Sequence, residues 1–106
     1  MSHYSVHDLE AVVKDRLADP DAVSYTRTLA AKGLGKCAQK VGEEAVETVI
    51  AALSREPEAL VAEAADLVYH LTVLLAVSDM SWRDVLAELE RRTGRSGLEE
   101  KASRLS

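Results

Sequence analysis

The sequence predicts an all-α fold, a bundle of four to five helices in one domain over residues 1–106. Apolar residues recur at helical spacing through most of the chain, and no stretch alternates apolar and polar residues as a half-buried strand does. Serine, proline and glycine residues stand where these helices would begin and end. We therefore expect a helical core over about 5–93 and a polar tail over 94–106.

Capping residues divide the first third of the chain into two helices. Ser5 is a good N-cap with Asp8 three residues later, and the helix that it starts is expected to end near Leu17. A short helix is expected to follow Ser24 and to end at Gly33, because glycine favours the position just after a helix C-terminus.

Three further helices are expected in the rest of the core. Apolar periodicity predicts long helices over about 35–54 and 57–78, joined by a short turn, with Pro57 in the first turn of the second. Ser81 caps the last helix, with an acidic residue three positions later, and Gly94 ends it.

Composition and charge exclude several classes of protein. The net charge of −5 leaves no basic excess to meet phosphates, so no nucleic-acid partner is expected. Cys37 is the single cysteine and cannot form an internal disulfide, so we interpret it as a small buried hydrophobe in a reducing compartment. The first ten residues lack the basic segment and the apolar run of a signal peptide, which indicates a cytoplasmic protein.

The segment over 60–77 is apolar enough to suggest a membrane helix. Glu63, Asp66 and His70 lie inside it, however, and ionisable residues in the middle of a membrane are expensive and rare. We therefore interpret the segment as a buried helix of a bundle and expect no membrane partner.

Three glutamates, Glu43, Glu44 and Glu47, fall within five residues of the segment KVGEEAVET over 40–48. Glu44 and Glu47 share a face of the helix that lies away from an apolar stripe. We expect that stripe to be buried, with Gly42 as a gap where a partner helix can approach. Its members are Ala38, Ala45, Val46, Val49, Ile50 and Leu53.

The next long helix carries a matching acidic strip of Glu63, Asp66 and His70 on an otherwise nearly all-apolar sequence. A short turn makes the two helices antiparallel neighbours, with its centre near residue 55. Glu47 and Glu63 are each eight residues from that centre, since 55−47 and 63−55 both equal 8. Glu44 and Asp66 are each eleven away, so four carboxylates are expected to converge.

Four converging carboxylates must take up protons, stay in water or bind a cation. Carboxylate ligands without cysteine suit a hard cation, Mg²⁺ or alternatively Mn²⁺, and Mg²⁺ often meets substrate phosphates. Lys36 and Lys40 continue the same row and are candidates to hold phosphate oxygens. Glu43 lies closer to the apolar stripe and is a candidate ligand, base or rim residue.

Other interpretations of these residues remain open. A single E-x-x-E on a helix is usually a solvated charged face, and the lysines can simply pair with Glu43 or Glu44 at helical spacing. His70 is a candidate to hydrogen-bond the acids, or else a core histidine with satisfied hydrogen bonds. Di-iron bundles add Glu-x-x-His motifs, and none occurs here, since Leu67 stands three residues before His70.

Longer stretches of the sequence resemble a known family. The segments KVGEEAVETVIAAL, EAADLVYHLTVLL and RTGRSGLEEKASR are similar to the phosphoribosyl-ATP pyrophosphohydrolases, within the all-α NTP pyrophosphohydrolase superfamily that includes MazG-like enzymes. The superfamily signature, E-x-x-E followed by E-x-x-D, corresponds to Glu44, Glu47, Glu63 and Asp66. The resemblance covers the chain from about residue 24 to the tail.

The resemblance implies a reaction and an assembly. The family hydrolyses phosphoribosyl-ATP to phosphoribosyl-AMP and pyrophosphate with Mg²⁺, the second step of histidine biosynthesis, and acts as a homodimer. A carboxylate that is not committed to the metal, Glu43 or Glu47, would then orient or deprotonate the attacking water. Two alternatives stay open: a MazG-like pyrophosphatase of free (d)NTPs, and a helical dimerisation module without enzymatic activity, whose acids are solvated.

Overall fold

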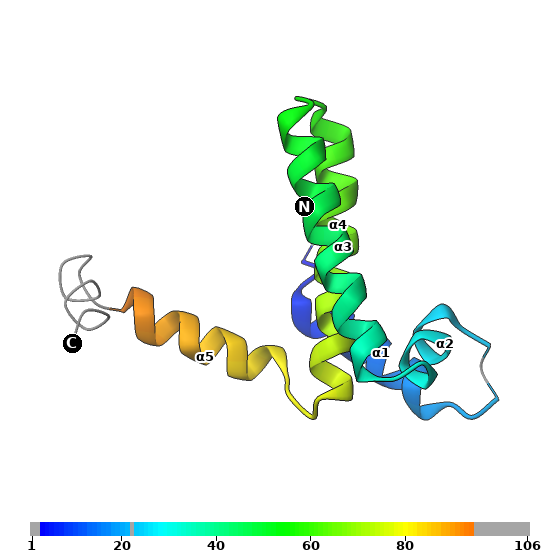
Figure 1. The fold of residues 1–106 in the computed structure, drawn as a ribbon. Coiled ribbons are helices and arrows are strands. Elements are labelled where there is room, and N and C mark those ends of the chain that lie inside the picture. The colour runs from blue at the N-terminus through cyan, green and yellow to red at the C-terminus, as the bar shows by residue number, and fades with distance from the viewer. Residues whose placement is uncertain (1–2, 22, 95–106) are drawn as a thin grey trace.

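The computed structural model describes residues 3–21 and 23–94, and this part of the chain contains five α-helices and no strand (Figure 1). The all-α prediction is confirmed, and each helix begins and ends within about two residues of its expected bounds. The helices are α1 (Val6–Ala18), α2 (Tyr25–Ala31), α3 (Leu34–Leu53), α4 (Pro57–Val77) and α5 (Trp82–Thr93).

The predicted capping residues set these bounds. The Asp8 N–H donates to Ser5 Oγ at 3.3 Å while the Ser5 N–H donates to the Asp8 carboxylate at 2.8 Å. Ser81 and Asp84 form the same reciprocal pair at the start of α5. Gly33 has a φ of 98°, a left-handed conformation that glycine adopts without strain, and there the chain turns from α2 into α3.

The arrangement of the helices is open rather than closed. α3 and α4 form a long antiparallel hairpin, α1 and α2 pack at its lower end in Figure 1, and α5 projects to the side from that end. The radius of gyration is 16.3 Å, whereas a compact domain of this length has about 13 Å. One chain therefore leaves much of the hairpin uncovered.

The hydrophobic core lies at the lower end, where α1 to α4 meet. Val13, Leu29, Cys37 and Val73 are its buried members. The interpretation of Cys37 as a buried hydrophobe is confirmed, since it is 1% exposed, and burial raises the pKa of its thiol. This core fixes the base of the hairpin and leaves the upper part to α3 and α4 alone.

Trp82 joins α5 to the core. Its indole N–H donates to Thr72 Oγ1 at 2.9 Å, and its backbone N–H donates to the Glu10 carboxylate at 2.7 Å. The start of α5 is thus fixed to both α4 and α1, while the rest of the helix projects away from them.

The expectation that the apolar stripe of α3 is buried is wrong for a single chain. Val46, Val49 and Ile50 are each more than half exposed, and a Cβ placed on Gly42 would meet nothing within 4 Å. Two helices packed side by side meet along a seam of 3.5-residue spacing. On α3 the less exposed residues of that seam are Cys37, Val41, Glu44, Thr48 and Ala51.

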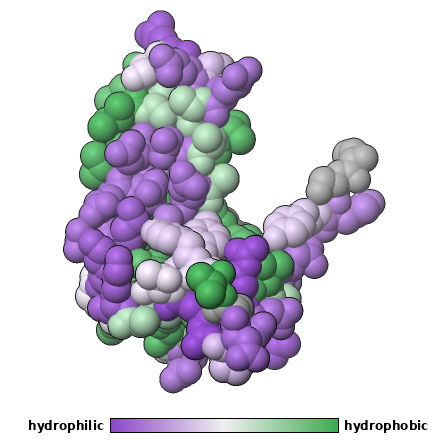
Figure 2. Space-filling view, turned by 90° about the vertical axis from the view of Figure 1, so that its right-hand side faces the viewer, coloured by the Kyte–Doolittle hydropathy of each residue, from purple (hydrophilic) through white to green (hydrophobic). Residues whose placement is uncertain are grey.

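The expectation that α4 is buried holds for its C-terminal half alone. Its buried residues are His70, Thr72 and Val73, whereas Val61 near its start is 69% exposed. In the described part of the chain, α4 is long and apolar enough to cross a membrane, and only 17% of its apolar window is buried within this chain. Figure 2 shows hydrophobic surface on the tall part of the molecule, on either side of a hydrophilic band.

Candidate active site

The α3–α4 hairpin brings carboxylates from both helices to one point. Oxygen atoms of Glu44, Glu63 and Asp66 lie within 4.8 Å of one another. Glu44 and Asp66 meet because they are equally far from the hairpin turn, as the spacing predicts. The Glu44 side chain is 14% exposed because it lies in the seam, whereas Asp66 faces solvent.

Glu47 lies on α3 close to these three acids but outside the group that converges within 4.8 Å. Its charge still acts on Glu63. Desolvation raises the pKa of Glu63, and the charges of Glu47, Glu44 and Asp66 raise it further, as does a hydrogen bond with Glu44. The four residues therefore form one electrostatic unit, which we name the carboxylate cluster.

The chemistry of the carboxylate cluster suits a hard divalent cation. All of its ligand atoms are carboxylate oxygens, which Mg²⁺ and Mn²⁺ prefer, whereas zinc sites favour cysteine and histidine. The raised pKa of Glu63, caused by desolvation and then by its three acidic neighbours, indicates negative charge in excess of the local positive charge. A bound cation would supply the missing charge.

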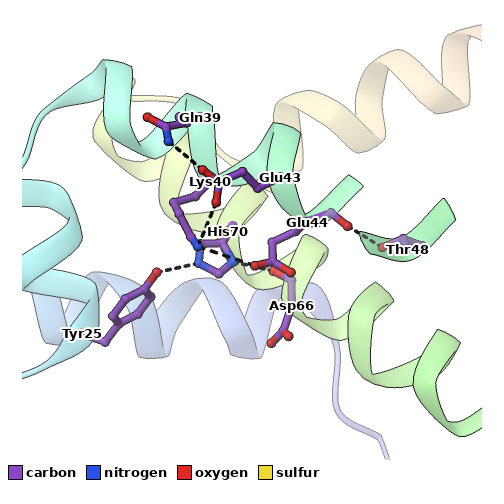
Figure 3. Close-up of polar contacts among 8 residues, drawn as sticks. All are labelled: Tyr25, Gln39, Lys40, Glu43, Glu44, Thr48, Asp66 and His70. Atoms are coloured by element: carbon purple, nitrogen blue, oxygen red, sulfur yellow. Dashed lines mark hydrogen bonds and ion pairs between the residues drawn. The ribbon is translucent and has the colours of Figure 1, made fainter. Parts of the chain in front are cut away.

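Lys40 lies at the edge of the carboxylate cluster (Figure 3). Its Nζ is 3.7 Å from Glu44 Oε1 and 3.4 Å from Glu43 Oε2. Burial lowers the pKa of Lys40, but the hydrogen bond to Glu43 and electrostatic interactions with Tyr25, Glu43 and Glu44 outweigh that effect and raise it. The ammonium group is thus charged and partly exposed, so it can meet an anionic ligand.

Glu43 points away from the carboxylate cluster in Figure 3 and belongs to a different set of contacts. Gln39 Nε2 donates to Glu43 Oε1 at 2.6 Å, and this bond, followed by the one from Lys40, lowers the pKa of Glu43. Lys36 is one turn before Lys40, and its charge also acts on Glu43. Glu43 and Lys36 therefore lie beside the cluster.

His70 is buried and forms hydrogen bonds with both ring nitrogens. Nδ1 lies 2.8 Å from the backbone carbonyl oxygen of Asp66, and Nε2 lies 3.0 Å from the Tyr25 hydroxyl. These contacts fit the interpretation of His70 as a satisfied core histidine that touches the cluster through the Asp66 backbone. Tyr25 was not among the predicted site residues, because its position depends on how α2 packs against α4.

Comparison with known proteins identifies the family. The model of the phosphoribosyl-ATP pyrophosphohydrolase family matches residues 6–93. The chain belongs to this family. The match confirms the resemblance and extends it to α1.

Curated relatives agree with this family. Proteins named phosphoribosyl-ATP pyrophosphatase from Sphingopyxis alaskensis and Novosphingobium aromaticivorans are 59% and 60% identical over 97 residues, which cover 91% of this chain and 89% and 90% of theirs. One from Agrobacterium fabrum is 52% identical over 104 residues, which cover 98% of this chain and 97% of its own.

The basic residues near the C-terminus are divided between α5 and the tail. On α5, Arg91 and Arg92 hydrogen-bond to Glu88, at 2.6 Å and 3.0 Å. The expected polar tail over 94–106 begins at Gly94, and the residues after it lie outside the described residues. The further basic residues of the tail, Arg95, Lys101 and Arg104, fall there; they are candidates for a solvated face or for phosphate contacts.

Proposed function

We propose that this chain catalyses the Mg²⁺-dependent hydrolysis of 1-(5-phosphoribosyl)-ATP to 1-(5-phosphoribosyl)-AMP and pyrophosphate, the second step of histidine biosynthesis, in the cytoplasm. The observation that carries the proposal is the convergence of Glu44, Glu63 and Asp66 within 4.8 Å in a chain of the phosphoribosyl-ATP pyrophosphohydrolase family. Relatives that are 52% to 60% identical bear the name phosphoribosyl-ATP pyrophosphatase, which supports the substrate.

The carboxylate cluster would hold Mg²⁺, or alternatively Mn²⁺, with Glu44, Glu63 and Asp66 as the converging ligands and Glu47 next to them. When bound, the ion would polarise the phosphate oxygens of the substrate and stabilise the charge of the leaving pyrophosphate. Lys40, at the exposed edge of the cluster, would hold a phosphate oxygen as a point charge, and Lys36 would add a second positive charge one turn away.

Hydrolysis requires a base for the attacking water. The water oxygen forms a bond to the α-phosphorus, the bond from that phosphorus to the bridging oxygen breaks, and pyrophosphate leaves with the electron pair. Of the two predicted catalytic carboxylates, Glu47 suits the base better. Glu43 is committed to Gln39, and its lowered pKa, due first to that bond and then to Lys40, makes it a weak base.

The test is pyrophosphate release from phosphoribosyl-ATP, with and without Mg²⁺, by the wild type and by Glu47→Gln. We expect Mg²⁺-dependent release, and a fall in kcat of about 100-fold or more in the variant, which is the usual contribution of a general base. Glu88→Gln, which removes an exposed acid of α5, is the matched control and is expected to act like the wild type.

Other outcomes would select another function. Release from a dNTP, but not from phosphoribosyl-ATP, would retain the metal site and favour a MazG-like pyrophosphatase. No release from any nucleotide, together with no effect of Mg²⁺ on the melting temperature, would favour a helical dimerisation module with solvated acids.

The exposed apolar surface of the hairpin supports a homodimer as the active assembly. On α3, Val49 and Ile50 are 57% and 55% exposed and Leu53 is 79% exposed, and on α4 Val61 is 69% exposed. Contiguous apolar surface of this kind marks an interaction site in soluble proteins. A membrane is a poorer cover, because Glu63 and Asp66 lie in the same part of α4 and charges are costly in hydrocarbon.

Substitution of Val49 by Asp tests the homodimer. A charge in the centre of an apolar interface is expected to weaken self-association at least tenfold, which sedimentation equilibrium measures. Val23→Asp is the matched control, because Val23 is fully exposed in a loop outside the patch. A wild-type protein that stays monomeric at high micromolar concentration would contradict the homodimer.

A further inference from the structure

Tyr25 on α2 lies against the face of α4 that carries Asp66. Its hydroxyl is 3.0 Å from His70 Nε2, and its ring packs against the ring of Tyr69 at a centroid distance of 6.2 Å (Figure 3). Tyr69 and His70 follow Asp66 by three and four residues, so these side chains are neighbours on one face of α4. Because Tyr25 contacts both of them, its ring lies one helical turn along α4 from Asp66, ~5.4 Å.

The ring of Tyr25 is held in place and is still open to solvent. His70 meets its hydroxyl end, with the two ring planes 83° apart, and the ring of Tyr69 lies at 29° to it in a stacked arrangement. Tyr25 is nevertheless 53% exposed. These contacts use the hydroxyl end and one face of the ring, so the other face is available to a ligand. An aromatic side chain that is already fixed loses little conformational entropy when a ligand binds.

An open aromatic face beside an anion-binding site can distinguish flat groups by their charge. The face of the ring carries partial negative charge and attracts a cation within about 6 Å of the ring centroid. A neutral flat group that stacks on the same ring gains the contact area but not this attraction. Tyr25 is therefore suited to select a flat cationic group over a neutral one.

The substrate of the proposed reaction carries such a group. Its second ribose is attached to N1 of the adenine ring, so N1 has no free lone pair. The amidine formed by N1, C6 and the exocyclic nitrogen then keeps its proton at neutral pH, and the base is a cation. The base of ATP lacks this substituent and is neutral. One ribose separates the base from the α-phosphate, which is comparable with the one helical turn between Tyr25 and Asp66.

We propose that Tyr25 determines specificity for the N1-substituted base of the substrate. With the phosphates at the carboxylate cluster and Lys40, the cationic adenine stacks on the open face of the Tyr25 ring, where the neutral adenine of ATP gains less. The inference rests on the proposed function for the identity of the substrate. It adds to that function a reason why phosphoribosyl-ATP is selected over ATP.

The test compares the binding of 1-methyladenosine 5′-monophosphate and of AMP, with Mg²⁺ present, by isothermal titration calorimetry. The two nucleotides differ by one methyl group on N1, which makes the base cationic. We expect the wild type to bind the methylated nucleotide about tenfold more tightly, the size of a cation–π interaction at a partly desolvated site. Tyr25→Phe keeps the ring and is expected to keep this preference, whereas Tyr25→Leu is expected to reduce it at least threefold.

Two controls separate the ring from general electrostatics and from other aromatic sites. The acids attract a cation equally in the wild type and in Tyr25→Leu, so a preference due to them alone would persist in that variant. Tyr4 is also more than half exposed, and it lines an apolar cavity with Ala64 and Val68. By helical spacing these two residues lie on the side of α4 opposite Asp66, so Tyr4→Leu is expected to keep the preference.

The position of the base has a spectroscopic signature that does not depend on any variant. In proton spectra of the wild type, the N-methyl signal of the bound nucleotide is expected to move upfield, because the ring current of Tyr25 shields a group stacked on its face. The shift is expected to persist in Tyr25→Phe and to become smaller in Tyr25→Leu.

Several results would overturn the role of Tyr25: equal affinity of the wild type for the two nucleotides, binding of neither, or an undiminished preference in Tyr25→Leu. A preference lost in Tyr25→Phe would assign it to the hydroxyl instead of the ring, and one lost in Tyr4→Leu alone would place the base in the cavity. A wild type that prefers the methylated nucleotide but does not hydrolyse phosphoribosyl-ATP would contradict the proposed function and support the role of Tyr25. Hydrolysis of phosphoribosyl-ATP without the preference would contradict the role of Tyr25 alone.

Discussion

Glu63 on α4 and Glu88 on α5 are the same type of residue on two solvent-facing helices, but their surroundings shift their acidity in opposite directions. Desolvation, followed by the charges of the other three members of the carboxylate cluster, raises the pKa of Glu63. Hydrogen bonds from Arg91 and then Arg92 lower the pKa of Glu88 to about 2.

The difference shows which acidic group has its negative charge compensated by cations of the chain and which does not. Glu88 meets its cations on its own helix, three and four residues away, so its charge is already compensated. Glu63 lies on the same helix as Asp66 and opposite Glu44 on α3, and oxygen atoms of the three residues converge within 4.8 Å. We therefore interpret Glu88 with its two arginines as a solvated face, and the carboxylate cluster as the candidate cation site.

Among the substitutions that test this contrast, the largest expected effect is on catalysis. Asp66→Asn removes a converging ligand without changing the size of the side chain, and we expect kcat/KM for phosphoribosyl-ATP to fall by about 100-fold or more, since even residues that only support metal ligands contribute 10- to 100-fold. Glu88→Gln removes an equal charge outside the cluster and is expected to change kcat/KM less than twofold. Similar losses in both variants would indicate a general effect of net charge.

The second effect is on stability, measured as the melting temperature in EDTA and in Mg²⁺. A ligand that binds the native state alone stabilises it by about 2.7 kcal/mol at 100 times its Kd. We expect a Mg²⁺-dependent rise of the melting temperature in the wild type and in Glu88→Gln, and none in Asp66→Asn. A rise of equal size in all three proteins would place the ion elsewhere.

The smallest effect is on the pH dependence of stability without metal. Because the folded-state pKa of Glu63 is raised, its ionised form destabilises the fold, so Glu63→Gln is expected to be more stable than the wild type at pH 7, with the difference vanishing below pH 4.5. Because the pKa of Glu88 is lowered from 4.5 to about 2, its contribution is present above pH 4.5 and is lost as the pH falls toward 2.

Urea unfolding of the two variants at pH 7 and at pH 4 checks these signs. Glu88→Gln is expected to be less stable than the wild type at pH 7, by a small amount because the ion pairs are exposed. If both variants shifted stability in the same direction at pH 7, the contrast between the two acidic groups would be wrong.

The sequence was sufficient to predict the helices and the meeting of Glu44, Glu63 and Asp66, because both depend on local information. It also predicted Glu47 in the same group, and Glu47 lies outside it. Capping residues such as Ser5 and Ser81 bound the helices, and a short turn near residue 55 fixes which residues of α3 and α4 lie level. Glu44 and Asp66 are brought together by that register alone.

Other features depend on contacts between distant segments, which periodicity does not specify. An apolar stripe such as that of Val49 and Ile50 indicates that something must cover it, but not whether the cover is the same chain or a second one. The direction of α5 depends on the anchoring of Trp82 to Thr72 and Glu10. The position of Tyr25 likewise depends on the packing of α2 against α4.

The most direct test of the central claim, that the carboxylate cluster holds a divalent cation, is the binding of Mn²⁺ measured by electron paramagnetic resonance. Titration of the wild type with Mn²⁺ is expected to show saturable binding that Mg²⁺ displaces and that Asp66→Asn abolishes, while Glu88→Gln binds as the wild type does. Absence of saturable binding, or equal binding by Asp66→Asn, would contradict the account.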